Sequence, residues 1–194
     1  MMRISDLIAH PTPCDVVIDF STASAVTDAI ALARSSAAAI LVGTTGLPDA
    51  ILRDLENESK HRAVLVCANT SVGIAAVSAA AAMMAQALGP AYRASIVETH
   101  HDKKLDAPSG TALRLARALS TAGMKIEKNE IFSVRAGDVV GEHTISIIGP
   151  GEVIELTHRA TTRDLFALGA IRLAHWLASR TPGLYTVEQA VGLV

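Results

Sequence analysis

Short apolar runs alternate with segments of helical periodicity through the first half of the chain. The runs at 15–20, 39–42 and 63–67 are rich in Val, Ile and Leu and are bounded by turn-forming residues, so they predict buried strands. The segments between them, 24–35 and 48–61, have the apolar spacing of helices. Strands and helices that alternate in this way predict a parallel sheet covered by helices, which is an α/β fold.

The second half of the chain follows a different pattern, in which several strands come in succession. We expect helices at 72–88, 108–122 and 163–179. We expect strands at 95–98, 131–134, 143–148 and 152–158. The third of these strands alternates polar and apolar residues, as a strand with one solvated face does, and Gly149-Pro150-Gly151 has the composition of a hairpin turn. This part is therefore expected to be α+β, with an open, largely antiparallel or mixed sheet.

The change of pattern predicts two domains with a boundary near residues 90–95. The first would span residues 1–93 and the second residues 94–162. The last helix and the residues that follow it, 163–194, would return to the first domain.

Composition narrows the class of protein. Half of the residues are hydrophobic and only 3% are aromatic, so the core must be built from Ala, Val, Ile and Leu. The net charge of -2 gives no indication of a nucleic-acid or membrane-surface partner. The helix at 72–88 carries Ser78 and Gln86 and is interpreted as a buried helix, not as a membrane span. Cys14 and Cys67 are expected to be buried, reduced thiols of a cytoplasmic protein, and the N-terminus lacks the apolar run of a signal peptide.

Small polar residues follow each of the three predicted parallel strands. They lie at Asp19–Thr22, Gly43–Gly46 and Cys67–Ser71. The carboxyl ends of parallel strands meet at one edge of a sheet, where ligands bind, although such residues also serve simply to cap helices. A G-x-G-x-x-G loop, which opens a dinucleotide-binding fold, does not precede Asp15, so this region would be the second half of such a fold.

The segment Glu98–Ala112 concentrates ionisable residues. Two histidines, two lysines and three acids lie in a loop that enters a helix near Pro108. The N–H groups of the first helical turn and the hydroxyls at 109–111 form an anion site, most naturally for a carboxylate, and Lys104 would add a positive charge. A histidine beside such a site can act as a general acid near neutral pH. The alternatives are a solvated charged loop with a capped helix, and a metal site, which the neighbouring lysines disfavour.

Together these motifs resemble the dihydrodipicolinate reductase family, the NAD(P)H-dependent enzymes of the diaminopimelate route to lysine. The family pattern E-x-H-H-x-x-K-x-D-x-P-S-G-T-A is matched at every specified position by Glu98–Ala112. Further matches to the family extend over essentially the whole chain. They lie at Asp15–Ser21, Gly43–Gly46, Asn69 with Ser71–Gly73, Arg135–Asp138, Gly141–His143, Ile154–His158 and Phe166–Ala170.

The resemblance implies an oxidoreductase that reduces 4-hydroxy-tetrahydrodipicolinate, a cyclic imine dicarboxylate, with NADPH or NADH. It implies that His100 protonates the ring carbon next to the hydride acceptor and that Lys104 is the second catalytic group. The residues implied to hold substrate carboxylate are His101, Ser109, Gly110 and Thr111. The residues implied to line the nicotinamide end of the cofactor site are Gly43, Thr44, Thr45, Cys67, Ala68, Asn69 and Thr70.

The resemblance also implies the assembly. The fold would be α/β, with a partial Rossmann-like parallel sheet and an α+β domain that binds substrate and joins subunits. The assembly would be a homotetramer. No metal ion is expected in the site. Four polar residues lie in the strands of the second domain or directly follow that domain, and we expect them to have structural or subunit-contact roles: Arg135, His143, His158 and Arg163. No role is expected for His10, His61 and His175.

The sequence departs from the family pattern at three places. The family's first strand, its glycine-rich phosphate loop and the residues that select NADH or NADPH have no counterpart, a difference of roughly sixty residues or about two βαβ-type units. The strand at 15–20 is therefore expected at an edge of its sheet, where it invites pairing with another chain. The stretch before Ile131 is shorter than in the family, and Thr70 stands where the family often has Phe. The alternative to an active reductase is a non-catalytic, oligomer-forming member with impaired cofactor binding.

Overall fold

The computed structural model, which describes residues 4–193, contains two sheets that lie in two separate units of the chain. The first unit extends to Thr70 and resumes at Phe166, and the second comprises Ser71–Leu165. The division therefore falls at Thr70 and not near residue 93, the boundary that the sequence suggested. Helix α4 (Val72–Leu88) belongs to the second unit because it packs against α5 (Gly110–Thr121) and strand β7 (Glu152–Ala160).

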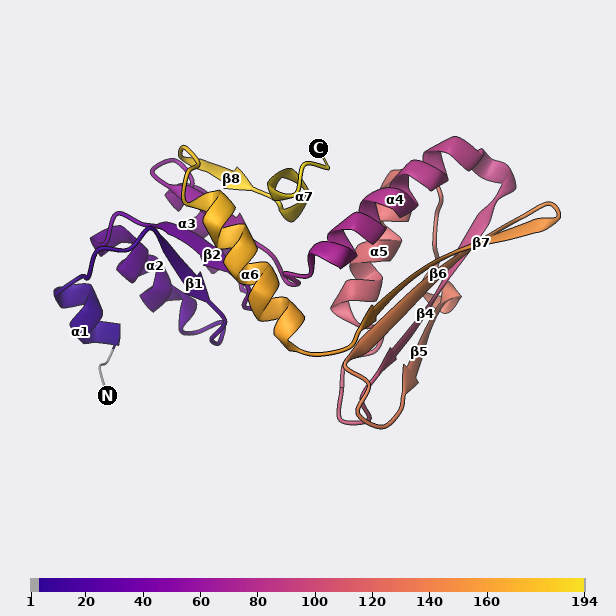
Figure 1. Cartoon of the computed structure of the whole chain (residues 1–194), viewed down its shortest axis with the longest axis horizontal. Coiled ribbons are helices and arrows are strands. Elements are labelled where there is room, and N and C mark those ends of the chain that lie inside the picture. The colour runs from indigo at the N-terminus through magenta and orange to yellow at the C-terminus, as the bar shows by residue number, and fades with distance from the viewer. Residues whose placement is uncertain (1–3, 194) are drawn as a thin grey trace. The chain divides into compact units, whose positions relative to one another are not determined.

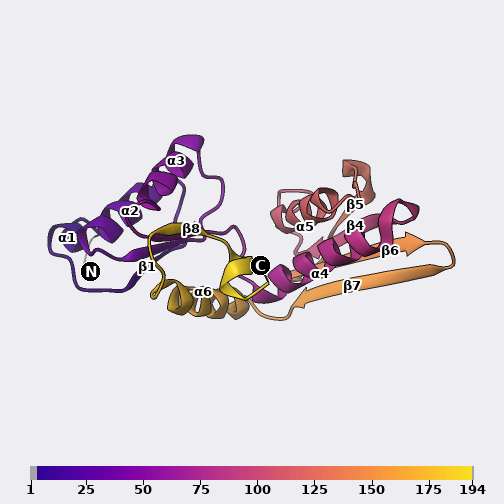
Figure 2. The ribbon, with the colours of Figure 1, turned by 90° about the horizontal axis from the view of Figure 1, so that it is seen from above.

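A four-stranded parallel sheet forms the centre of the first unit and confirms the predicted strand–helix alternation. Its order is β1 (Val16–Asp19), β2 (Ala39–Val42), β3 (Ala63–Val66) and β8 (Gly183–Tyr185). One face carries α2 (Val26–Ser35) and α3 (Asp49–Glu58), and the other carries α6 (Asp164–Leu177) (Figures 1 and 2). The core on the α2 side is built from Ala, Val, Ile and Leu, as the composition required: Val26, Ala29, Ile30, Ala33, Ile40, Val42, Leu55 and Val64.

Within residues 4–193, strand β1 lies at the edge of this sheet, as expected for the run at 15–20. Ile18 and Phe20 are 41% and 54% exposed, so the run that was predicted to be buried is covered on one side only. Cys14, just before β1, is exposed, and the prediction that both cysteines are buried is wrong for it. Cys67 is buried, and both cysteines are free thiols.

Three short elements were not predicted from the sequence. They are α1 (Ile4–Ala9), β8 and α7 (Val187–Ala190), and two 3-10 turns accompany them at Gly89–Ala91 and Lys128–Glu130. Each has six residues or fewer, which is too short to show a periodic pattern.

The second unit contains a mixed sheet, which confirms the α+β prediction. Its order is β5 (Ile131–Arg135), β4 (Arg93–His100), β6 (Gly141–Gly149) and β7, with β4 and β5 parallel and the other pairs antiparallel. The predicted turn at 149–151 joins β6 to β7. Helices α4 and α5 cover one face of the sheet (Figure 2). The core between helices and sheet includes Ala81, Ala85, Ala94, Ile96, Leu115, Leu119, Ile145 and Ile147.

Helix α4 is amphipathic in its packing although apolar in its sequence. A stripe of residues at helical spacing is buried: Ile74, Ala75, Ser78, Ala81 and Ala85. Met83, on the opposite side, is 71% exposed, so the helix is not buried all round as the sequence suggested. Within residues 4–193, the segment Val72–Ala91 alone is long and apolar enough to span a membrane, a test that core helices of soluble proteins also pass.

Candidate active site

A polar layer lies at one end of the helix-covered face of the mixed sheet. Every second residue of β4 faces the helices, because side chains alternate along a strand. Ala94 and Ile96 are therefore buried in the apolar core, and Glu98 and His100 follow on the same face. The neighbouring strands add polar residues at the same level, because His143 of β6 pairs with Glu98 and Arg135 of β5 pairs with His100. The segment that the sequence singled out is therefore joined by residues from two further strands.

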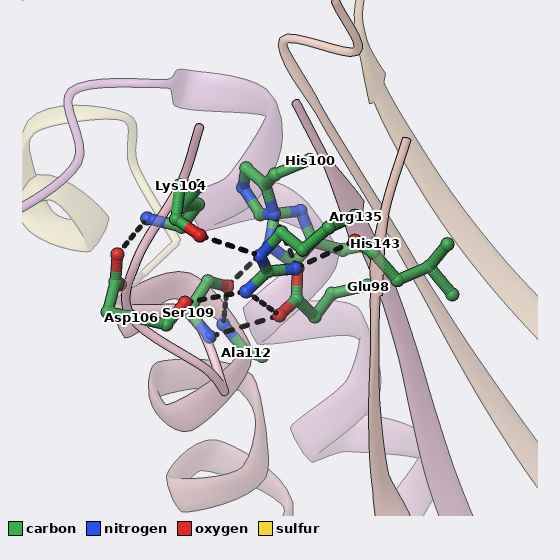
Figure 3. Close-up of polar contacts among 9 residues, drawn as sticks. Glu98, His100, Lys104, Asp106, Ser109, Ala112, Arg135 and His143 are labelled. Carbon is green, nitrogen blue, oxygen red and sulfur yellow. Dashed lines mark hydrogen bonds and ion pairs between the residues drawn. The ribbon is translucent and has the colours of Figure 1, made fainter. Parts of the chain in front are cut away.

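Glu98 is the centre of this layer and is fully buried (Figure 3). Arg135 donates from both terminal nitrogens, at 3.0 Å to Oε2 and 2.9 Å to Oε1, and His100 Nδ1 hydrogen-bonds to Oε2. The Ser109 backbone N–H donates to Oε1 at 3.3 Å. Burial by itself would raise the pKa of Glu98, but Arg135, with Ser133 and His100, brings it down to about 2. The carboxylate is consequently ionised throughout the physiological range.

Arg135 also fixes the loop that carries Lys104. Its Nε donates to the Lys104 carbonyl at 3.2 Å, and a terminal nitrogen donates to the Asp106 carbonyl at 2.6 Å. Lys104 Nζ in turn donates to Asp106 Oδ1 at 2.7 Å, and this ion pair lowers the pKa of Asp106. One guanidinium therefore holds both the buried carboxylate and the charged loop in place, which its planar set of donors allows.

His100 is 8% exposed and is held on the sheet by Glu98. Its Nδ1 faces the ionised carboxylate, which favours the tautomer that carries hydrogen on Nδ1. A Cβ atom at Gly141 would lie 3.0 Å from Nε2, so a glycine at that position leaves space beside this nitrogen. Burial lowers the pKa of His100, Glu98 opposes that shift, and the positive charges of Lys104 and Arg135 add to it. The imidazole is therefore mainly neutral at pH 7 in the free protein.

The N-terminus of α5 lies directly against this layer. Ser109 is its N-cap, and its Oγ accepts the Ala112 N–H at 3.2 Å. The same oxygen is 3.1 Å from Nε2 of His143, a buried side chain whose pKa burial lowers to about 4. Gly110 is exposed and Thr111 is half-buried, and His101 is half-buried at the start of the loop. The predicted anion site thus lies beside the predicted acid.

Two residues of this cluster were given other roles from the sequence. Arg135 and His143 were first expected to have structural or subunit-contact roles, and Glu98 was given no role of its own. Here Arg135 binds Glu98, and His143 lies between Ser109 and His100. The available signal was strand alternation, since Glu98 and His100 are two residues apart and must share a face.

The residues predicted to line the cofactor site lie at the carboxyl edge of the parallel sheet in the first unit. Asp19 is buried there and accepts hydrogen bonds of 2.5 Å from both Ser21 and Thr44. Thr45 and Ala68 are exposed, whereas Gly43, Thr44, Cys67 and Thr70 are buried, and Asn69 is half-buried. Thr70 donates its hydroxyl hydrogen to the Phe166 carbonyl at 2.7 Å, so this side chain closes onto α6.

This edge offers polar groups of the kind found at ligand sites of parallel sheets. It has a loop with glycines at both ends and the exposed residues Thr45 and Ala68, which follow two neighbouring parallel strands. The 194 residues contain no G-x-G-x-x-G run of the kind that cradles a pyrophosphate. The residues present therefore fit the nicotinamide end of a dinucleotide.

Comparison with known proteins gives matches along nearly the whole chain. Residues 2–70 match the family described as dihydrodipicolinate reductase, N-terminus, and residues 73–191 match dihydrodipicolinate reductase, C-terminus. The 4-hydroxy-tetrahydrodipicolinate reductases of Myxococcus xanthus (strain DK1622) and Acinetobacter baumannii (strain AYE) are 40% and 37% identical over 195 and 198 residues. These alignments cover 92% and 93% of this chain and 72% of each relative.

A solved structure shares the fold. A dipicolinate-bound dihydrodipicolinate reductase from Paenisporosarcina sp. TG-14 aligns with a TM-score of 0.78 and 22% identity, over 98% of this chain and 78% of that chain. The two matching family descriptions together cover far more than half of the sequence. The chain therefore belongs to the dihydrodipicolinate reductase family, whose members are NAD(P)H-dependent oxidoreductases.

Proposed function

We propose that this chain reduces 4-hydroxy-tetrahydrodipicolinate to tetrahydrodipicolinate with NADPH or NADH, with loss of the 4-hydroxyl group as water, in lysine and diaminopimelate biosynthesis. The observation that carries the proposal is the cluster of Glu98, Arg135 and His100 beside the N-terminus of α5. It combines a histidine oriented by an ionised carboxylate with a helix N-terminus that suits a substrate carboxylate. The relatives are named for this reaction, and one of them was solved with dipicolinate bound.

Substrate carboxylate would be bound at the first turn of α5. The N-terminus of a 12-residue helix offers N–H groups and a partial positive charge, and Gly110 is exposed there. Ser109 and Thr111 contribute hydroxyls on the same turn, and Lys104 and His101 lie in the loop just before it. Because both of its carboxylates are negative, the substrate also lowers the repulsion among the positive groups of this loop.

His100 would deliver the proton to the ring carbon next to the hydride acceptor. Glu98 accepts the Nδ1 hydrogen, so Nε2 is the atom that receives and releases the transferred proton. The pKa of His100 is lowered in the free protein, and a bound dianion would raise it again by stabilising the imidazolium. Substrate binding would thus bring the acid into the protonated form in which it acts, with Lys104 as the second catalytic group.

The cofactor would be held at the carboxyl edge of the parallel sheet. NAD(P)H supplies the hydride when it is bound. The residues proposed to line its nicotinamide end are Gly43, Thr44, Thr45, Cys67, Ala68, Asn69 and Thr70. Asp19 positions this loop through its hydrogen bonds to Ser21 and Thr44, and Gly43 donates its N–H to the Asp19 carbonyl at 2.8 Å.

The uncovered face of the mixed sheet is proposed to join subunits of a homotetramer. It carries apolar side chains with exposed fractions of 40% or more: Val97, Phe132, Val134, Ile148 and Val153. An apolar surface of this kind on an open sheet is typical of an oligomer interface. Sedimentation equilibrium would test it, since Phe132→Glu should shift the chain toward smaller assemblies.

The test of the function is a titration of the purified chain with NADPH and NADH in the presence of pyridine-2,6-dicarboxylate, followed by steady-state reduction assays. Saturable binding at about micromolar concentration and turnover are expected, since a substrate analogue and the sheet edge each contribute binding energy. A folded oligomer that binds neither nucleotide would support the alternative, a non-catalytic member of the family.

A further inference from the structure

Two helix N-termini of the second unit are held by the same pair of residue types. Ser71 caps α4 by accepting the Ile74 N–H, and its Oγ is 3.2 Å from Nε2 of His158. Ser109 caps α5 in the same way and contacts His143. His143 and His158 face each other as partners on β6 and β7, and α4 packs against α5. Two neighbouring strands thus clamp two neighbouring helices through one repeated serine–histidine contact.

The two clamps differ in what surrounds them. The His143 ring lies edge-on to His100, with ring centroids 5.1 Å apart and an interplanar angle of 78°. Ser109 also donates its N–H to Glu98, so the α5 clamp is joined to the cluster on both sides. The contact of His158 is instead with the cap of α4, which carries none of the groups proposed to bind substrate. The α4 clamp is therefore a natural reference for the α5 clamp.

We propose that His143 is a positioning residue for the reduction, which fixes both the first turn of α5 and the plane of His100. The inference rests on the function proposed above. His143 Nε2 shares a hydrogen bond with the Ser109 hydroxyl, while the same oxygen accepts the Ala112 N–H, so the cap is held from two sides. The same ring packs edge-on against His100, whose Nδ1 is held by Glu98, so the two contacts together restrict the plane of His100. Binding and proton transfer both depend on placement to within a fraction of an ångström.

The experiment compares His143→Leu with His158→Leu, since each removes one clamp and leaves a side chain of similar bulk. Calorimetry with pyridine-2,6-dicarboxylate measures the affinity for the dicarboxylate, and urea unfolding measures the free energy of unfolding. Both variants should lose similar stability, because each leaves a helix cap without its partner. His143→Leu should weaken dicarboxylate binding about tenfold and raise KM to match, a loss that misplacement of binding groups by less than 1 Å explains. His158→Leu should bind as the wild type does.

The conservative variant His143→Gln completes the design, because its amide can donate to or accept from the serine hydroxyl and should restore most of the affinity. If His143→Leu does not fold, His143→Gln is compared with His158→Gln by the same two measurements. Equal affinity in the His143 and His158 variants overturns the positioning role and leaves the proposed function intact. Failure of the wild-type chain to bind the dicarboxylate overturns the proposed function itself.

Discussion

Each unit of the molecule contains one buried glutamate held by arginine. In the first unit, Glu58 accepts from Arg34 Nε at 2.8 Å and from Arg62 Nε at 2.7 Å. In the second, Glu98 accepts from both terminal nitrogens of Arg135. Burial alone would raise the pKa of either carboxyl, and the arginines more than offset it, so both pKa values are lowered. Geometry and charge alone do not separate the two clusters.

The remaining partners distinguish them. Glu58 is surrounded by guanidinium groups, which stay protonated at any physiological pH, and Arg62 also donates to the carbonyls of Ala33 and Ala38. Glu98 has a histidine as its third partner and a helix N-terminus beside it. The first cluster consists of a glutamate and two arginines, whereas the second includes a histidine, the residue type whose ordinary pKa lies closest to neutral pH. The two buried glutamates therefore differ in one partner: Glu98 also hydrogen-bonds to a histidine, which can carry a proton.

The largest expected difference comes from replacing each carboxylate by its amide. Glu58→Gln and Glu98→Gln should each lower the free energy of unfolding by about 2 kcal/mol, because each leaves a partly buried arginine, Arg62 or Arg135, without its counter-charge. Glu98→Gln should in addition reduce kcat about a thousandfold, since the imidazolium of His100 loses its stabilising partner. Urea unfolding and steady-state kinetics measure the two effects. Unchanged kcat in Glu98→Gln, or an equal fall in Glu58→Gln, would contradict the distinction.

A fall in pH should destabilise the second unit before the first, because the second contains the buried His143. The pKa of His143 is about 4 in the folded chain against 6.5 for an exposed histidine, so the unfolded state binds the proton more tightly. Its contribution is complete above pH 6.5 and is lost as the pH falls toward 4, a change of roughly 3 kcal/mol. The lowered pKa values of Glu58 and Glu98 stabilise the fold above their ordinary pKa of 4.5. This stabilisation is lost only when the pH falls below that value. Urea unfolding from pH 8 to pH 4 should show this first loss, and His143→Gln should reduce it.

The sequence predicted the strand–helix order well and singled out the segment 98–112, because both depend on local patterns. The apolar run at 39–42 predicted β2, and the apolar, Ala-rich segment 72–88 predicted helix α4, each with its observed ends. Arg135 was not assigned to the site, because its contact with Glu98 joins residues 37 positions apart and depends on the parallel pairing of β4 with β5. The three-residue β8 was missed because pairing with β3, and not its own composition, makes it a strand.

The space beside His100 gives a test that leaves every charge in place. In Gly141→Ala the added Cβ would lie 3.0 Å from Nε2 and 3.3 Å from Cδ2 of His100, closer than ordinary van der Waals contact. The imidazole must shift, and we expect kcat/KM to fall about a hundredfold because proton transfer requires near-ideal geometry. The melting temperature checks that the fold persists. Normal kinetics in a variant with unchanged stability would show that Nε2 does not need this space.

The smallest expected effect concerns two lysine ion pairs of the second unit that have the same spacing. Lys104 Nζ lies 2.7 Å from Asp106, and Lys125 Nζ lies 2.5 Å from Glu127. Lys104 is the more buried of the two, with 22% of its side chain exposed against 80% for Lys125. As pairs near the surface, both should contribute little to stability, so Lys104→Met and Lys125→Met should unfold almost as the wild type does.

Binding separates these two lysines. Lys104→Met should weaken pyridine-2,6-dicarboxylate binding about tenfold, because it removes a positive charge that lies close to the α5 N-terminus in a partly desolvated loop. Lys125→Met should leave the affinity unchanged. The wild-type affinity should also fall as salt is added, and the fall should be smaller in Lys104→Met, since salt screens the charge that this variant lacks. Equal affinities and equal salt dependence in both variants would remove Lys104 from the binding site and leave its ion pair with Asp106 a surface contact only.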